Sequence, residues 1–191
     1  MSRCPAWSRA SLLTCLVLAA ALARGLVPPS ATGGALLFAT CLAAIWAASN
    51  RERWSGRSRD EDRWQVVPAL LLGGLVAGLL LAPNLFGASP GRALTGLLPW
   101  SIGVGTVATS EEVVIRGPVQ SAWCQAAGLP VALLASASVF TAVHLPTYGV
   151  SALPVDFAAG LALAGLRAVT GRVLPCVFAH SAADWGAWFW S

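Results

Sequence analysis

Six titratable side chains lie in apolar surroundings in the C-terminal half of this 191-residue chain. A charged side chain at the centre of a membrane helix costs about 2.5–3.5 kcal/mol on insertion scales, so such residues are functional candidates by default. Carboxylates and imidazoles are also the groups that general acid–base catalysis uses most often. The candidates, which include both histidines of the chain, are Glu111, Glu112, Arg116, His144, His180 and Asp184.

The spacing of these residues suits helices. Glu112 and Arg116 are four residues apart with the acid first, which is the favourable order for an ion pair on a helix. His180 and Asp184 have the same separation, and Phe140 lies four residues before His144. The plainer interpretation is that polar pairs join helices inside a membrane. Six such residues on three helices favour a site that does chemistry.

The composition indicates what must position these residues. Apolar residues make up 57% of the chain and charged residues 10%, against roughly 25% charged in soluble domains. This excludes a soluble enzyme and a disordered protein. Uncharged apolar stretches of about 18 residues or more are typical of membrane spans. We therefore predict an all-α, polytopic transmembrane bundle of six to eight helices embedded in a lipid bilayer.

Apolar stretches and turn residues predict where these helices lie. A first span ends near Arg24, although its flanks also fit a signal peptide. Residues 93–110 are ambiguous, because Pro99, two glycines and several hydroxyls interrupt them. Ser110 could cap a helix that starts at Glu111, or one longer helix could run through to Gly128. The other spans are expected at about 31–48, 65–82, 131–145, 151–169 and 173–190.

Charge predicts the orientation of the chain. The net charge of +4 comes from arginine, with no lysine, and arginines are concentrated in residues 51–63. If the first two helices both cross, Arg3, Arg9 and this segment lie on one side, which the positive-inside rule makes cytoplasmic. We expect a multi-pass protein of the bacterial inner membrane, and no nucleic-acid partner.

Three short motifs carry a family resemblance. Glu111-Glu112-Val113-Val114-Ile115-Arg116 matches EExxxR, Phe140 to His144 matches FxxxH, and His180 to Asp184 matches HxxxN/D. In this order the chain resembles the CPBP family of intramembrane glutamic endopeptidases, the CAAX proteases and bacteriocin-processing (Abi) enzymes. The resemblance divides the chain into N-terminal helices without motifs at 1–92 and a catalytic helical core at 93–191.

The resemblance implies peptide hydrolysis by an activated water, with no metal and no other cofactor. Glu111 would be the general base, and His144 would help to hold and polarise the water. His180 and Asp184 would face the scissile carbonyl as an oxyanion-stabilising pair, while Glu112 and Arg116 would support the site and orient Glu111. An ionised aspartate cannot donate a hydrogen bond, so Asp184 must be protonated or must orient His180 instead. Phe140 is a candidate substrate contact.

The expected partner is a membrane-tethered protein or peptide cleaved near its terminus, and the sequence predicts no oligomeric state. The substrate could be a prenylated CAAX-type tail, a leader peptide or a C-terminal sorting signal. Three alternatives stay open. Two histidines and a glutamate could bind zinc in a membrane protease, Cys176 could act as a nucleophile one turn before His180, and the fold could serve as an immunity or scaffold protein. The five cysteines have no metal-ligand spacing, and no disulfide framework is expected.

The side that the site faces depends on residues 93–110. If they span separately from the helix at Glu111, the site lies in the cytoplasmic leaflet and suits prenylated tails or leader peptides. Arg167 and Arg172 then lie outside, which counts against this arrangement. If residues 93–110 do not span separately, the site faces outward and suits sorting signals of exported proteins.

Overall fold

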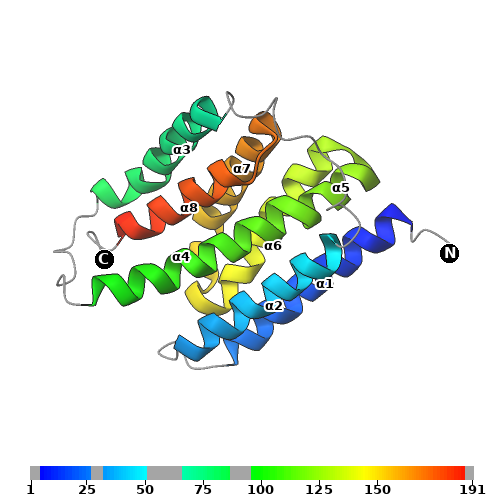
Figure 1. Cartoon of the computed structure of the whole chain (residues 1–191), viewed down its shortest axis with the longest axis horizontal. Coiled ribbons are helices and arrows are strands. Elements are labelled where there is room, and N and C mark those ends of the chain that lie inside the picture. Colours follow the sequence, from blue (N-terminus) through cyan, green and yellow to red (C-terminus); the bar gives the residue numbers. More distant parts are fainter. Residues whose placement is uncertain (1–4, 27–31, 51–65, 87–95, 188–191) are drawn as a thin grey trace.

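The fold is an all-helical bundle, as the composition predicts. The computed structural model describes residues 5–26, 32–50, 66–86 and 96–187, and these residues form helices and turns without any strand. The bundle is drawn in Figure 1. Its α-helices are α1 (Ala6–Gly25), α2 (Thr32–Asn50), α3 (Val66–Phe86), α4 (Leu97–Val114), α5 (Gln120–Ala127), α6 (Leu129–Tyr148), α7 (Leu153–Thr170) and α8 (Leu174–Ala187).

The ambiguous region is one long helix. α4 continues through a π-helical turn, η2 (Ile115–Val119), directly into α5. The hydroxyl of Ser110 donates to the carbonyl of Thr106 at 2.8 Å instead of capping a helix start at Glu111. The rod ends at Gly128, whose φ of 83° suits glycine, and α6 begins at the next residue.

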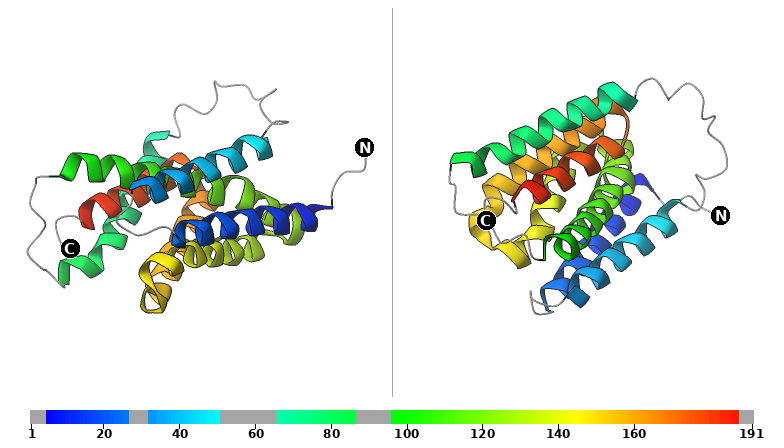
Figure 2. Two further views of the ribbon diagram at one scale, coloured as in Figure 1. Left: turned by 90° about the horizontal axis from the view of Figure 1, so that it is seen from below. Right: turned by 60° about the vertical axis from the view of Figure 1, so that its left-hand side comes forward.

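Successive helical rods in the described part of the chain run in alternating directions, as Figures 1 and 2 show. Trp7, near the start of α1, stacks edge-on against Trp123 of α5 at 5.6 Å, and Arg9 donates to the carbonyl of Ser49 near the end of α2. We call this the proximal end of the bundle. At the opposite, distal end, Trp185 of α8 donates to the carbonyl of Ser101 of α4.

Among the residues that the structure describes, three helices are long and apolar enough to cross a membrane: Ala6–Gly25, Leu129–Tyr148 and the stretch Val150–Thr170, which includes the short 3₁₀ turn η3 (Val150–Ala152). Shorter apolar stretches occur at Gly34–Ser49 of α2 and Val66–Leu81 of α3. The protein is therefore an integral membrane protein. The last expected span is present as α8 to Ala187, and its remaining residues lie outside the described residues.

The first helix is an integral part of the bundle. Its residues Ala10, Val17 and Ala21 are buried in a core that also contains Phe38 and Leu42 of α2. The indole of Trp123 donates to the hydroxyl of Thr14 at 3.1 Å, which joins α1 to α5. α1 thus forms one wall of the space into which the polar residues of α4, α6 and α8 project.

Candidate active site

The two adjacent glutamates of α4 point toward different partners. Both are buried, with 2% of Glu111 and none of Glu112 exposed. Neighbouring residues on an α-helix differ by about 100° in direction. Glu111 therefore faces α1 and α6, while Glu112 faces α8 and the π turn below it.

Glu112 joins the arginine of the first motif to the histidine of the third. Its Oε2 accepts from Arg116 Nε at 2.9 Å, and its Oε1 lies 3.2 Å from His180 Nδ1. A carboxylate facing an arginine can only accept, so His180 Nδ1 is the donor in this contact. The described contacts of Glu112 are with Arg116 and His180, and none is with Glu111.

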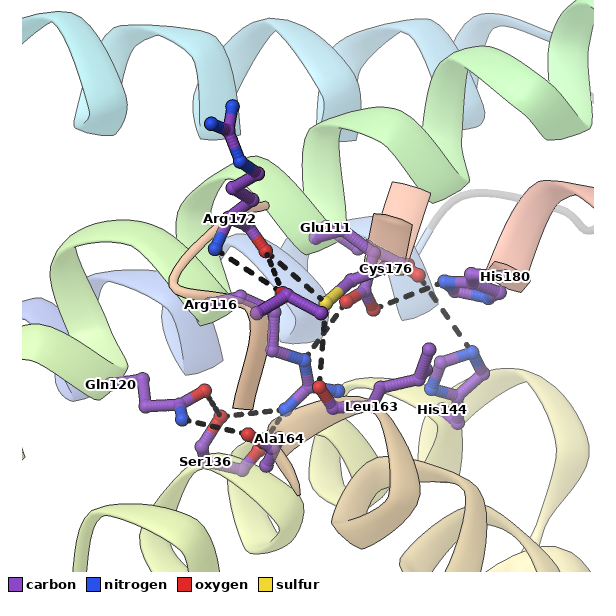
Figure 3. A network of polar contacts seen from close by, with 12 residues as sticks. Glu111, Arg116, Gln120, Ser136, His144, Leu163, Ala164, Arg172, Cys176 and His180 are labelled. Atoms are coloured by element: carbon purple, nitrogen blue, oxygen red, sulfur yellow. Dashed lines mark hydrogen bonds and ion pairs between the residues drawn. The ribbon is translucent and has the colours of Figure 1, made fainter. Parts of the chain in front are cut away.

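Arg116 is held by a buried polar network, shown in Figure 3. Its Nη1 donates to Ser136 Oγ at 2.6 Å and to the Ser136 carbonyl at 3.4 Å. Ser136 in turn donates to Gln120 Oε1, and Gln120 Nε2 donates to the carbonyl of Ala164. These bonds connect the π turn to α5, α6 and α7. The guanidinium also lies 5.1 Å from the centre of the Phe140 ring.

His144 is positioned by its own helix. Its Nδ1 lies 2.8 Å from the carbonyl oxygen of Phe140, so Nδ1 carries the hydrogen and donates it. Its Nε2 is left facing Glu111 Oε2 at 3.8 Å. The ring of Tyr148 stacks on the imidazole, with 5.6 Å between the ring centres.

His180 lies between two carboxylates. One is Glu112, and the other is Asp184, whose Oδ2 is 3.5 Å from His180 Nε2. His180 is 5% exposed, whereas the side chain of Asp184 is 39% exposed. Phe140 is buried against both imidazoles, at 4.5 Å from His144 and 5.2 Å from His180, so it fixes the two rings relative to one another.

A cavity of about 90 Å³ lies beside Glu111 and His144. Tyr148, Asp184 and Arg24 contribute the other polar side chains of its wall, and Ala35, Gly103, Val104 and Val107 contribute the apolar part. This volume can hold a few water molecules. A larger groove of about 590 Å³ is lined by other residues of α4 and α8, and none of the six candidates is among them.

The structure therefore brings all six predicted residues into one cluster. Glu111, His144 and Asp184 line the cavity, and His180, Glu112 and Arg116 lie behind it. Phe140 is 3% exposed and is not among the residues that line the cavity.

Three residues of this arrangement are missing from the sequence prediction. Arg24 reaches Glu111 Oε1 at 3.6 Å and lies over the ring of Phe38, but in the sequence it resembles an ordinary residue at the end of a span. Gln120 and Ser136 are isolated polar residues in apolar helices, which is the signal that could have identified them.

The cysteines that the structure describes do not take part in the cluster. The four that the structure describes are free thiols. Cys176 is buried, and its Sγ donates to the carbonyl of Leu163 at 3.4 Å. Its Sγ also lies 3.9 Å from the carbonyl of Arg172, so its hydrogen bonds are with backbone carbonyls and not with His180.

Three residues of the cluster are also arranged so that they could bind a metal ion. Ligand atoms of Glu111, His144 and His180 all lie within 4.8 Å of one another. Two imidazole nitrogens and one carboxylate form a donor set that catalytic zinc uses. His180 can take part because Glu112 engages its Nδ1 and leaves its Nε2 on the side of the cluster.

Comparison with known protein families identifies what the chain is similar to. A family model described as type II CAAX prenyl endopeptidase Rce1-like matches residues 92–186. No curated protein and no solved structure matches the chain. The matched residues contain all three motifs, and the first three helices precede them.

Proposed function

Because residues 92–186 place this chain in the Rce1-like CAAX prenyl endopeptidase family, a family of membrane endopeptidases, we propose that it is an intramembrane glutamic endopeptidase. It cleaves a membrane-tethered protein or peptide near its terminus. One observation carries this proposal. Glu111 Oε2 and His144 Nε2 face one another at 3.8 Å, and both residues line the same small cavity.

This pair is suited to binding one water molecule. His144 donates its Nδ1 hydrogen to the Phe140 carbonyl, so the neutral ring presents Nε2 as an acceptor. Glu111 is a second acceptor. A water between them donates one hydrogen to each group, and an oxygen lone pair is then directed into the cavity. This orientation is what attack on a substrate carbonyl requires.

The reaction follows from this geometry. Glu111 removes a proton from the water as its oxygen bonds to the carbonyl carbon. The carbonyl oxygen takes up the negative charge of the tetrahedral intermediate. The C–N bond then breaks as Glu111 returns the proton to the leaving nitrogen, so the carboxylate is regenerated.

His180 is the candidate for stabilising the oxyanion. Glu112 accepts from its Nδ1 and so fixes the plane of the ring, and Arg116 in turn fixes Glu112. A protonated His180 can then direct its Nε2 hydrogen at an oxyanion. Asp184 lies beside that nitrogen and acts as a positioning residue. Removing one oxyanion donor costs about 10²–10³-fold in rate, which sets the scale of this contribution.

The test is proteolysis by purified, detergent-solubilised protein on a pool of membrane-tethered peptides. Glu111→Gln keeps the size of the side chain and removes the base, so we expect kcat to fall by at least about 10²-fold. His144→Ala should also abolish cleavage while the protein still inserts. The matched control is Glu61→Gln, the same change outside residues 92–186, which should cleave like the wild type. Cleavage retained by Glu111→Gln would refute the mechanism.

The donor set of Glu111, His144 and His180 favours a second candidate, a zinc-dependent membrane protease. The same assay separates the two, because a chelator would abolish zinc-dependent cleavage and leave the glutamic mechanism untouched. A third outcome, no cleavage of any peptide in the pool by the wild type, would favour an immunity or scaffold role.

A further inference from the structure

The cavity lies at the distal end of the bundle. Arg24 and Tyr148 come from the last turns of α1 and α6, and Asp184 comes from the last turn of α8. Ala35 comes from the first turn of α2, and Gly103 comes from the second turn of α4. These helix ends meet on the same side of the molecule, as the directions of the rods in Figures 1 and 2 show.

The arginines are concentrated at the opposite, proximal end. Arg9 lies in the first turn of α1, and Arg167 and Arg172 flank the turn between α7 and α8. The five arginines of residues 51–63 lie in sequence between the end of α2 and the start of α3, and both of these helix ends are proximal. At the distal helix ends, the sequence offers only Arg24 and Arg92.

This asymmetry orients the molecule in the membrane. Arginines in short loops near the ends of spans stay in the cytoplasm, whereas acidic residues contribute little to orientation. Residues 51–65 are such a short connection. The proximal end is therefore cytoplasmic, and the distal end faces the other side of the membrane.

The continuous rod of α4, η2 and α5 determines on which side of the membrane the cavity lies. If residues 93–110 crossed separately, the direction of each later helix would be reversed and Arg167 and Arg172 would be outside. One rod instead brings Arg167 and Arg172 to the same end as Arg9 and as the end of α2 and the start of α3, between which residues 51–63 lie in the sequence. The positive-inside rule therefore gives the same orientation for each of these connections.

We propose that the catalytic cavity opens on the extracytoplasmic side of the membrane, and that the substrate is a membrane-tethered segment of an exported protein. This rests on the proposed endopeptidase function. A prenylated tail in the cytoplasm would lie at the proximal end, away from Glu111 and His144. The terminal anchor of an exported protein meets the cavity at the depth of the outer leaflet.

Thiol labelling tests the orientation without any proteolysis. In a form whose five native cysteines are replaced by serine or alanine, Val150→Cys places a reporter in the exposed η3 turn at the distal end. Gln125→Cys, the matched control, places an exposed reporter at the proximal end of α5. A membrane-impermeant maleimide is added to intact spheroplasts of a bacterial host. We expect Val150→Cys to react at once and Gln125→Cys to react only after lysis, and the reverse pattern would overturn the proposal.

A second measurement determines on which side of the membrane the substrate is cleaved. One reporter peptide is anchored in the membrane by the same apolar segment in two forms, with the cleavable part outside or in the cytoplasm. We expect the wild type to cleave the exported form, and Glu111→Gln to cleave neither. Cleavage of the cytoplasmic form alone would overturn the extracytoplasmic assignment while leaving the endopeptidase intact. If neither form is cut by the wild type although labelling gives the expected orientation, the substrate class is wrong.

Discussion

Glu111 and Glu112 are neighbours in the chain, but their surroundings suit them to different tasks. Glu112 is fully buried, each of its oxygens is engaged, one by Arg116 and one by His180, and it is not among the residues that line the cavity. Glu111 has longer contacts, at 3.6 Å to Arg24 and 3.8 Å to His144, which leave room for a water. A general base needs this looser environment, whereas a positioning residue needs the tighter one.

Arg24 provides a test at this scale. Its guanidinium stabilises the ionised carboxylate of Glu111, the form that accepts a proton. We expect Arg24→Gln to slow cleavage by roughly tenfold. Arg24→Lys should restore most of the activity, because Arg24 acts through its positive charge and not through paired hydrogen bonds from its guanidinium. The measurement is kcat and KM on one tethered peptide. Equal kcat for Arg24→Gln and the wild type would contradict this role.

Arg116 is expected to be needed for folding as well as for catalysis. Arg116→Met leaves the carboxylate of Glu112 buried without its cation, which costs about 3–5 kcal/mol. The double variant Glu112→Gln with Arg116→Met removes both charges and keeps an acceptor for His180. We expect it to recover most of the lost stability in thermal unfolding in detergent. A double variant as unstable as Arg116→Met would show that the ion pair is not the cause.

At the scale of elements, the crossing of α6 and α7 sets the position of His144. Gly160 of α7 packs directly on α6, and a Cβ there would lie 3.1 Å from the Cα and O of Ala137 and from the Phe140 ring. Both neighbours belong to the helix that carries His144. Gly165, which like Gly160 belongs to α7, has no atom within 4 Å of such a Cβ.

These two glycines form a matched pair for experiment. Gly160→Ala should push α6 away from α7, lower Tm by several degrees and reduce cleavage, because the Phe140 and His144 rings shift together. Gly165→Ala should instead stabilise α7 by about 0.5–1 kcal/mol through helix propensity and leave cleavage unchanged. Thermal unfolding and activity are measured on both. Equal effects of the two changes would argue against a packing role for Gly160.

At the scale of the whole molecule, the sequence was sufficient to predict the all-helical class of fold and to select the candidate site residues. Apolar stretches predicted helices close to those observed, and charge in apolar surroundings identified all six members of the cluster. Residues 93–110 could not be decided, because their hydroxyls resemble signals for a helix start. In the structure, Thr106 and Ser110 donate back to carbonyls of their own helix, at 2.7 and 2.8 Å, and so do not interrupt it. Arg24 could not be found from the sequence, because only the packing of α1 against α2, α5 and α6 brings it to Glu111.

The position of Arg24 has a consequence for modularity. The family match begins at residue 92, and every motif lies inside it, so the matched stretch resembles a self-contained enzyme. Yet Arg24 and Ala35 form part of the cavity wall, and both belong to helices that precede the match. A fragment of residues 92–186 would contain all three motifs but would lack this part of the cavity wall. We therefore expect the shortest active form of the protein to be longer than the segment that the family match recognises.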